Sequence, residues 1–129
     1  MRLVLCLIVC ALAVSAAEAE TPSTITKSIR ARIGATVAIG TFGQHSYTTC
    51  EPIGGGSVQT TKPPSLGEIR TTEDQPYIER HSISGTCIGA HLLGTRVDYT
   101  ARSAGNDSFE FDMVFNNGTI HYVVNSTNR

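Results

Sequence analysis

The sequence predicts an all-β protein, an antiparallel β-sandwich of seven to eight short strands with one disulfide. After the first 19 residues, no window of a dozen residues repeats apolar positions at the 3.6-residue spacing of a helix. Glycines and prolines interrupt the chain every few residues. Short alternating segments recur, separated by turn signals about every ten residues, which is typical of sandwiches.

Residues 1–19 resemble an export signal. Arg2 is followed by an apolar run from Leu3 to Val14, and Ala17-Glu18-Ala19 provides small residues at the cleavage positions. The run is short for a membrane span and no second one follows it, so we expect no transmembrane segment in the mature chain. The prediction is a secreted or periplasmic chain of residues 20–129 that forms a single domain.

Removal of this leader leaves Cys50 and Cys87 as the remaining cysteines. In an oxidising compartment, two such cysteines most simply pair with each other. A thiolate metal site or a free thiol is the alternative, but no C-x-x-C pair is present. We expect the bridge near one end of the sandwich, between the region of Gly54 and the segment 85–94. The net charge of -1 lacks the basic footprint of a nucleic-acid binder.

The strands follow from alternation and from residues with high β-propensity. Pro63-Pro64 must lie between two strands, because a central strand cannot contain them. The expected strands are Ser28–Arg32, Ala35–Phe42, Ser57–Lys62, Gly67–Thr72, Tyr77–Ile83, Thr95–Arg102, Ser108–Phe115 and Thr119–Asn125.

The last two strands are predicted to form a hairpin. Asn117-Gly118 suits a two-residue turn in which both residues have positive φ. This turn would pair residues that are all apolar or aromatic, namely Phe115 with Ile120, Met113 with Tyr122, and Phe111 with Val124. The opposite face would carry Glu110, Asp112 and His121 in water.

The last half of the chain resembles bacterial immunoglobulin-like and cadherin-like extracellular modules. The matching residues are Val97, Tyr99, Gly105, Asp107, Phe109, Phe111, Gly118, Val123 and Val124, with Pro64-x-x-Gly67 upstream. The resemblance implies an immunoglobulin-like sandwich and a structural, adhesive or ligand-binding role rather than catalysis. For Asp107 we expect a structural role, in which the carboxylate accepts backbone N–H groups at a loop end.

The leading functional hypothesis is a non-enzymatic binding module at a bacterial envelope or outside the cell, with a protein or glycan ligand. Loop tips of sandwiches often carry binding surfaces. We expect such tips at Gly54, Gly55 and Gly56 and at Pro63 and Pro64. A small inhibitor that presents one of these loops to a secreted enzyme is a further hypothesis.

The rival hypothesis is a periplasmic Cu or Zn binding protein. A bridge between Cys50 and Cys87 would bring His45 and His91 to one end of the fold, where Glu51 could be a third ligand. In the leading hypothesis there is no cofactor, and these histidines are ordinary loop residues.

Catalytic signals are weak. The residue types of a triad occur in Asp74, His81 and Ser82, but no Gly-x-Ser-x-Gly motif is present. Adjacent strand residues such as His81 and Ser82 point to opposite faces. We therefore do not expect an enzyme. Glycosylation sequons occur at Asn106, Asn117 and Asn125, and matter only in a eukaryotic source.

Overall fold

The protein is seen in a computed structural model that describes residues 23–80 and 86–129. The predicted signal peptide, residues 1–19, lies outside the described residues, as do His81 and Ser82. The eight strands are β1 (Ser23–Ala31), β2 (Thr36–His45), β3 (Pro52–Gly55), β4 (Ser57–Lys62), β5 (Gly67–Ile78), β6 (His91–Ala101), β7 (Gly105–Phe115) and β8 (Gly118–Asn128).

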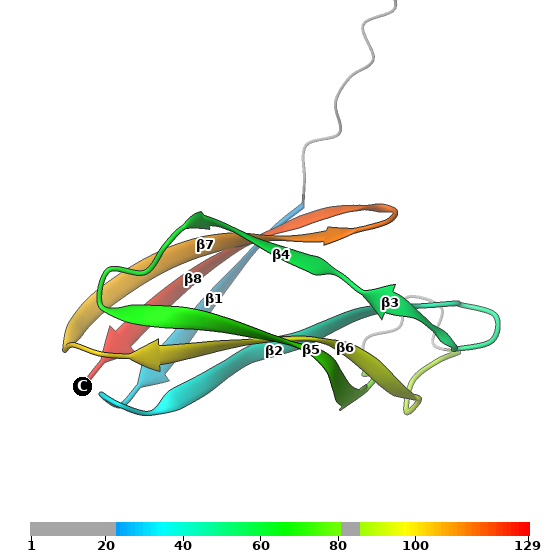
Figure 1. Ribbon diagram of the computed structural model, residues 1–129, viewed down its shortest axis with the longest axis horizontal. Coiled ribbons are helices and arrows are strands. Elements are labelled where there is room, and N and C mark those ends of the chain that lie inside the picture. The colour runs from blue at the N-terminus through cyan, green and yellow to red at the C-terminus, as the bar shows by residue number, and fades with distance from the viewer. Residues whose placement is uncertain (1–22, 81–85) are drawn as a thin grey trace, which may run out of the picture.

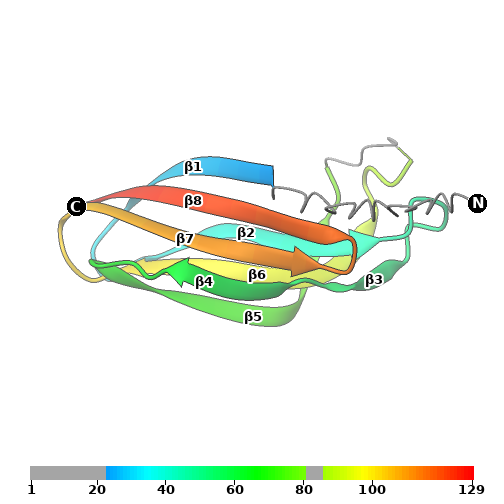
Figure 2. The ribbon, with the colours of Figure 1, turned by 90° about the horizontal axis from the view of Figure 1, so that it is seen from above.

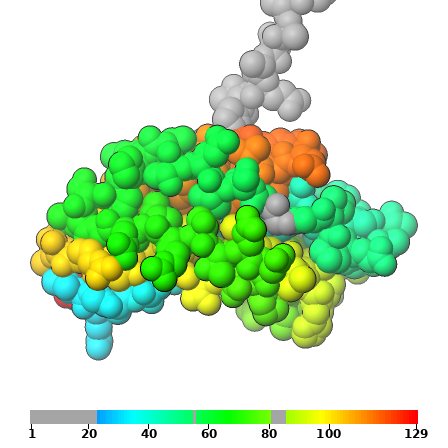
Figure 3. All heavy atoms as spheres, viewed as in Figure 1, coloured from blue at the N-terminus to red at the C-terminus, as the bar shows by residue number. Residues whose placement is uncertain are grey.

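The strands form two facing sheets, with orders β1-β8-β7-β4 and β3-β2-β6-β5 (Figure 1). This is the predicted β-sandwich, with four strands in each sheet. Its strand orders differ from the two sheets of constant-type immunoglobulin domains, because β1 lies in the sheet of β7 and β8. There β1 pairs in parallel with β8, the exception to the antiparallel pairing predicted throughout. Strands β4 and β5 cover the side that faces the viewer in Figure 3.

The core lies between the sheets because alternate residues of each strand point inward. In β6 and β7 this alternation is nearly unbroken over eleven residues each. Tyr99, Phe109, Phe111 and Met113 are all fully buried. Aromatic contacts join the two layers, with Tyr99 stacked on Phe109 at 4.8 Å and Phe42 against Tyr122 at 4.9 Å between ring centroids.

The predicted strands at Gly67–Thr72 and Tyr77–Ile83 belong to one strand, β5, which ends at Ile78. The polar run between them does not end the strand. A register shift between Thr72 and Gln75 absorbs it, with Asp74 at φ 55°. Residues 81–83 of the predicted second strand lie outside the described residues.

The predicted register of the last hairpin is wrong by two residues. Phe115 pairs with Gly118 and Phe111 pairs with Tyr122, so the loop is Asn116-Asn117. Gly118 has a φ of 151°, whereas neither asparagine has positive φ. A shift of two residues keeps every side chain on its predicted face, because the period of a strand is two.

The predicted loop tip at Gly54–Gly56 is also wrong. Gly54 and Gly55 belong to β3, and the buried Gly56 carries the chain from one sheet to the other. A Cβ at Gly56 would lie 2.7 Å from both Met113 Sδ and Phe115 Cε1, so the crossing needs glycine. Pro63 and Pro64 do lie between two strands, β4 and β5, as predicted.

Candidate functional site

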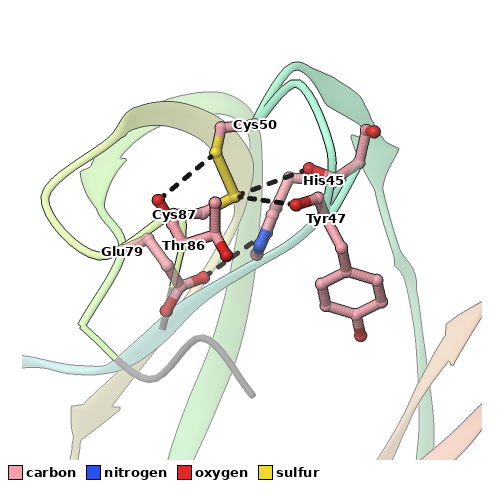
Figure 4. A network of polar contacts seen from close by, with 7 residues as sticks. His45, Tyr47, Cys50, Glu79, Thr86 and Cys87 are labelled. Atoms are coloured by element: carbon pink, nitrogen blue, oxygen red, sulfur yellow. Dashed lines mark hydrogen bonds and ion pairs between the residues drawn. A yellow bond between two sulfur atoms is a disulfide. The ribbon is translucent and has the colours of Figure 1, made fainter. Parts of the chain in front are cut away.

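The disulfide joins two loops at one end of the sandwich, far from the C-terminus (Figures 1 and 2). Cys50 follows β2 and Cys87 precedes β6, with 5.4 Å between their Cα atoms. The predicted bridge and its place near one end are confirmed. Cys87 Sγ lies 3.5 Å from the carbonyl oxygen of Ser46, so the bridge packs against the turn that leaves β2 (Figure 4).

An open groove lies between the two sheets at this end. Its volume is about 660 Å³, within the range of small-ligand sites. The β7–β8 hairpin provides one wall, and the ends of β2 and β5 provide the other. The groove is lined by Thr41, Phe42, Gly43, His45, Tyr47, Tyr77, Ile78, Glu79, Arg80, Phe115, Ile120 and Tyr122.

Two glycines make room for Tyr77, whose side chain crosses the inner surface of the sheet. A Cβ at Gly43 would lie 2.9 Å from Tyr77 Oη, and one at Gly94 would lie 3.1 Å from Tyr77 Cε1. The same Cβ at Gly94 would meet the backbone oxygen of Phe42 at 2.4 Å. A side chain at either position would therefore clash with the Tyr77 ring and with backbone atoms of the neighbouring strand.

The groove contains buried polar groups without hydrogen-bond partners. The His45 side chain is only 8% exposed, and neither ring nitrogen has such a partner. Nδ1 lies 3.6 Å from Glu79 Oε2, which is too long for a hydrogen bond. Tyr77 Oη is likewise buried and unpartnered. Burial raises the pKa of Tyr77, and the nearby Glu79 carboxylate raises it further.

Lys27 of β1 contacts β2 beside the aromatic side chains that line the groove. Its ammonium donates to the carbonyl oxygen of Ile39 at 3.0 Å. It also lies 5.6 Å from the ring centroid of Phe42 and 5.8 Å from that of Tyr122. Two aromatic side chains of the groove lining, Phe42 and Tyr122, therefore lie close to a cation.

The opposite end of the sandwich is closed by a buried polar network around Asp107. Its carboxylate accepts backbone N–H groups of Ser65 and Leu66, each at 2.9 Å, which confirms the structural role predicted for it. Tyr99 Oη donates to the same carboxylate at 2.8 Å and accepts from Asn128 Nδ2 at 2.8 Å. Burial alone would raise the pKa of Asp107, but these hydrogen bonds outweigh it and lower the pKa.

The outer face of the hairpin carries the charged cluster predicted to face water. His121 lies between Asp112 at 2.6 Å and Glu110 at 3.0 Å, and all three side chains are partly exposed. Hydrogen bonds to Asp112 and then to Glu110 raise the pKa of His121. Since both ring nitrogens face carboxylates, the cluster favours the imidazolium.

The structure does not gather the three predicted metal ligands. His45 lies against Glu79, whereas His91 and Glu51 are exposed. Within residues 23–80 and 86–129, no three His, Cys, Asp or Glu side chains form a group that could hold a metal ion. Asp74 is exposed in the bulge of β5, and the sequon residues Asn106, Asn117 and Asn125 are exposed.

Sequence reasoning identified His45 but missed the residues that surround it. The sequence predicted Phe115, Ile120 and Tyr122 on the core face of the hairpin, Phe42 at the end of a strand, and Tyr77 at the start of a separate strand. In the sequence, Gly43 and Gly94 were the one indication of the groove. They indicate it only once the structure shows that the Tyr77 ring lies over both glycines.

Comparison with known protein families, characterised proteins and solved structures finds no match to this chain. The described part of the chain contains no helix long and apolar enough to cross a membrane.

Proposed function

We propose that the protein is an exported, non-enzymatic binding module whose disulfide-bridged end receives a protein or glycan ligand. The observation that carries the proposal is the groove with the side chains of His45 and Tyr77, whose buried polar atoms lack hydrogen-bond partners. Buried polar groups are normally hydrogen-bonded, and exceptions concentrate at functional sites. The aromatic lining suits an apolar side chain or the face of a sugar ring, and the imidazole and phenol supply hydrogen bonds.

The export signal and the disulfide support a place outside the cytoplasm, at a bacterial envelope or beyond it. The bridge also ties the two loops beside the groove, which reduces the conformational entropy lost on binding.

Photo-crosslinking tests this proposal. A benzoylphenylalanine at Tyr47, which lines the groove and is 52% exposed, should capture a specific component of an envelope extract. The same residue at Leu93, which is 45% exposed and outside the groove, is the matched control. Thr41→Phe, which fills the groove, should abolish the Tyr47 adduct. Identical adducts at both positions, or an adduct unaffected by Thr41→Phe, would contradict the proposal.

The metal-binding alternative retains one favourable observation, the unpartnered Nε2 of buried His45. Calorimetric titration with Zn²⁺ and Cu²⁺ separates the two functions. Sub-micromolar binding that is lost in the His45→Ala, His91→Ala double variant would favour the metal protein over the groove ligand.

A further inference from the structure

Three arginines line one shallow cavity at the end of the sandwich opposite the disulfide. Arg30, Arg32 and Arg129 surround a space of about 570 Å³, together with Ala31 and Ile33. Main-chain hydrogen bonds hold Arg129 in place. Its N–H donates to Ala31 at 3.0 Å, and its carbonyl oxygen accepts from Ile33 at 3.2 Å. We call these three residues the arginine patch.

The two stretches of chain that contain the patch carry no acidic side chain, since no Asp or Glu occurs in residues 23–50 or 113–129. Among the described residues, none of the three guanidinium groups forms an ion pair, whereas Arg96 pairs with Asp98 and Arg102 with Glu68. The protein as a whole carries a net charge of -1, so the patch is a local excess of positive charge.

A second cavity continues from the patch across the outer face of β1, β8 and β7. Arg30 lines both cavities, and the second has a volume of about 430 Å³. Its exposed or half-buried polar lining consists of Ser28, Asn106, Ser108, Asn125 and Thr127. The one carboxylate in that lining, Asp107, is 5% exposed and already accepts four hydrogen bonds. It therefore presents little negative charge to a ligand.

We propose that this surface binds an anionic polysaccharide. The guanidinium groups of arginine bind sulfate, phosphate or carboxylate groups well, because their paired N–H donors can bond to two oxygens of one oxyanion. The adjoining amides and hydroxyls both donate and accept, as hydroxyl-rich sugar units require. Binding of an acidic protein would not require the adjoining row of uncharged hydroxyl and amide side chains. A lipid surface would need exposed apolar side chains, and the arginine patch offers few of them beyond Ile33. This site is separate from the groove, which lies at the other end of the molecule.

Binding of a fluorescent heparin oligosaccharide at low ionic strength tests the proposal, with neutral dextran as the blank. Arg32→Gln with Arg129→Gln should weaken binding at least about tenfold, since each change removes a charge-assisted contact. Lys62→Gln with Arg70→Gln removes the same charge from exposed positions elsewhere and should change it by less than about twofold. Asn125→Ala should also weaken heparin binding while leaving the charge unchanged.

Three results would overturn the proposal. The wild-type protein could fail to bind heparin, or both double variants could lose affinity equally, which would indicate only net charge. Vesicles of phosphatidylglycerol could bind through the arginine patch while heparin does not, which would assign the surface to lipid. Unchanged circular dichroism and melting temperature confirm that the variants are folded.

Discussion

The two ends of the sandwich differ in whether their buried polar groups have hydrogen-bond partners. At the closed end, the side chains of Asp107, Tyr99 and Asn128 hydrogen-bond to one another, and Asp107 also accepts three backbone N–H groups. At the disulfide-bridged end, the side chains of His45 and Tyr77 are partly buried, their buried polar atoms have no hydrogen-bond partners, and a groove lies between the sheets.

Under the proposed function, the closed end contributes mainly to stability and the disulfide-bridged end to ligand binding. A satisfied buried network fixes one arrangement of the chain, whereas an unsatisfied group costs free energy until a partner arrives. The covalent bridge lies at the end where the polar atoms of His45 and Tyr77 lack hydrogen-bond partners, whereas the network around Asp107 lies at the other end.

Removing the bridge should have the largest effect. Cys50→Ala with Cys87→Ala should lower the free energy of unfolding by about 4 kcal/mol, because the 37-residue separation closes a long loop. Urea denaturation measures the loss, and reduction of the wild-type protein should reproduce it. A loss below about 1 kcal/mol would mean that the groove end is held by its packing instead.

Asp107→Asn should cost about 3 kcal/mol, since it removes a charge and leaves buried donors without an acceptor. Asp112→Asn on the exposed face is the control and should cost far less.

Because the folded pKa of Asp107 lies below its ordinary value of 3.8, the unfolded chain takes up the proton first. Its stabilising contribution is therefore complete above that pH and is lost as the pH falls through the folded pKa. Acid titration of the wild-type and Asn variants checks this.

The same Tyr→Phe change should have opposite consequences at the two ends. Tyr99→Phe removes a donor to Asp107 and an acceptor from Asn128, and should cost about 2 kcal/mol. Tyr77→Phe removes a hydroxyl that has no partner, and should leave the stability unchanged or raise it by up to about 1 kcal/mol. Thermal or urea denaturation measures both. Equal losses would show that Tyr77 has a partner in solution and would remove one basis for the binding groove.

The sequence predicted more of the closed end than of the groove end. It predicted that the Asp107 carboxylate accepts backbone N–H groups, but not that two of them come from Ser65 and Leu66 in a distant loop, nor the bond from Tyr99. The faces of the final hairpin were also correct, but polarity with a period of two cannot distinguish registers that differ by two residues. Gly56 was misread as a loop because a glycine at a sheet crossing has the same sequence appearance as one in a turn. The groove depends on Tyr77 lying across Gly43 and Gly94, a contact between three strands that no local pattern records.

The smallest predicted effect concerns the outside of the hairpin that walls the groove. The pKa of His121 is raised because its ring bonds to Asp112 and Glu110, whereas in the unfolded chain it returns to about 6.5. The folded state therefore holds the proton more tightly, and the stabilisation is complete below pH 6.5 and lost as the pH rises through the folded pKa. An NMR titration of the His121 ring should give a midpoint above 6.5, and Asp112→Asn should lower it.

Amide exchange at Thr119 and Ile120 should quicken above that midpoint beyond the intrinsic effect of pH, while exchange at Tyr99 should not. A wild-type midpoint at or below 6.5 would show that the carboxylates do not hold the imidazolium. The hairpin would then depend on its buried face alone, and the groove would keep the same wall at every pH.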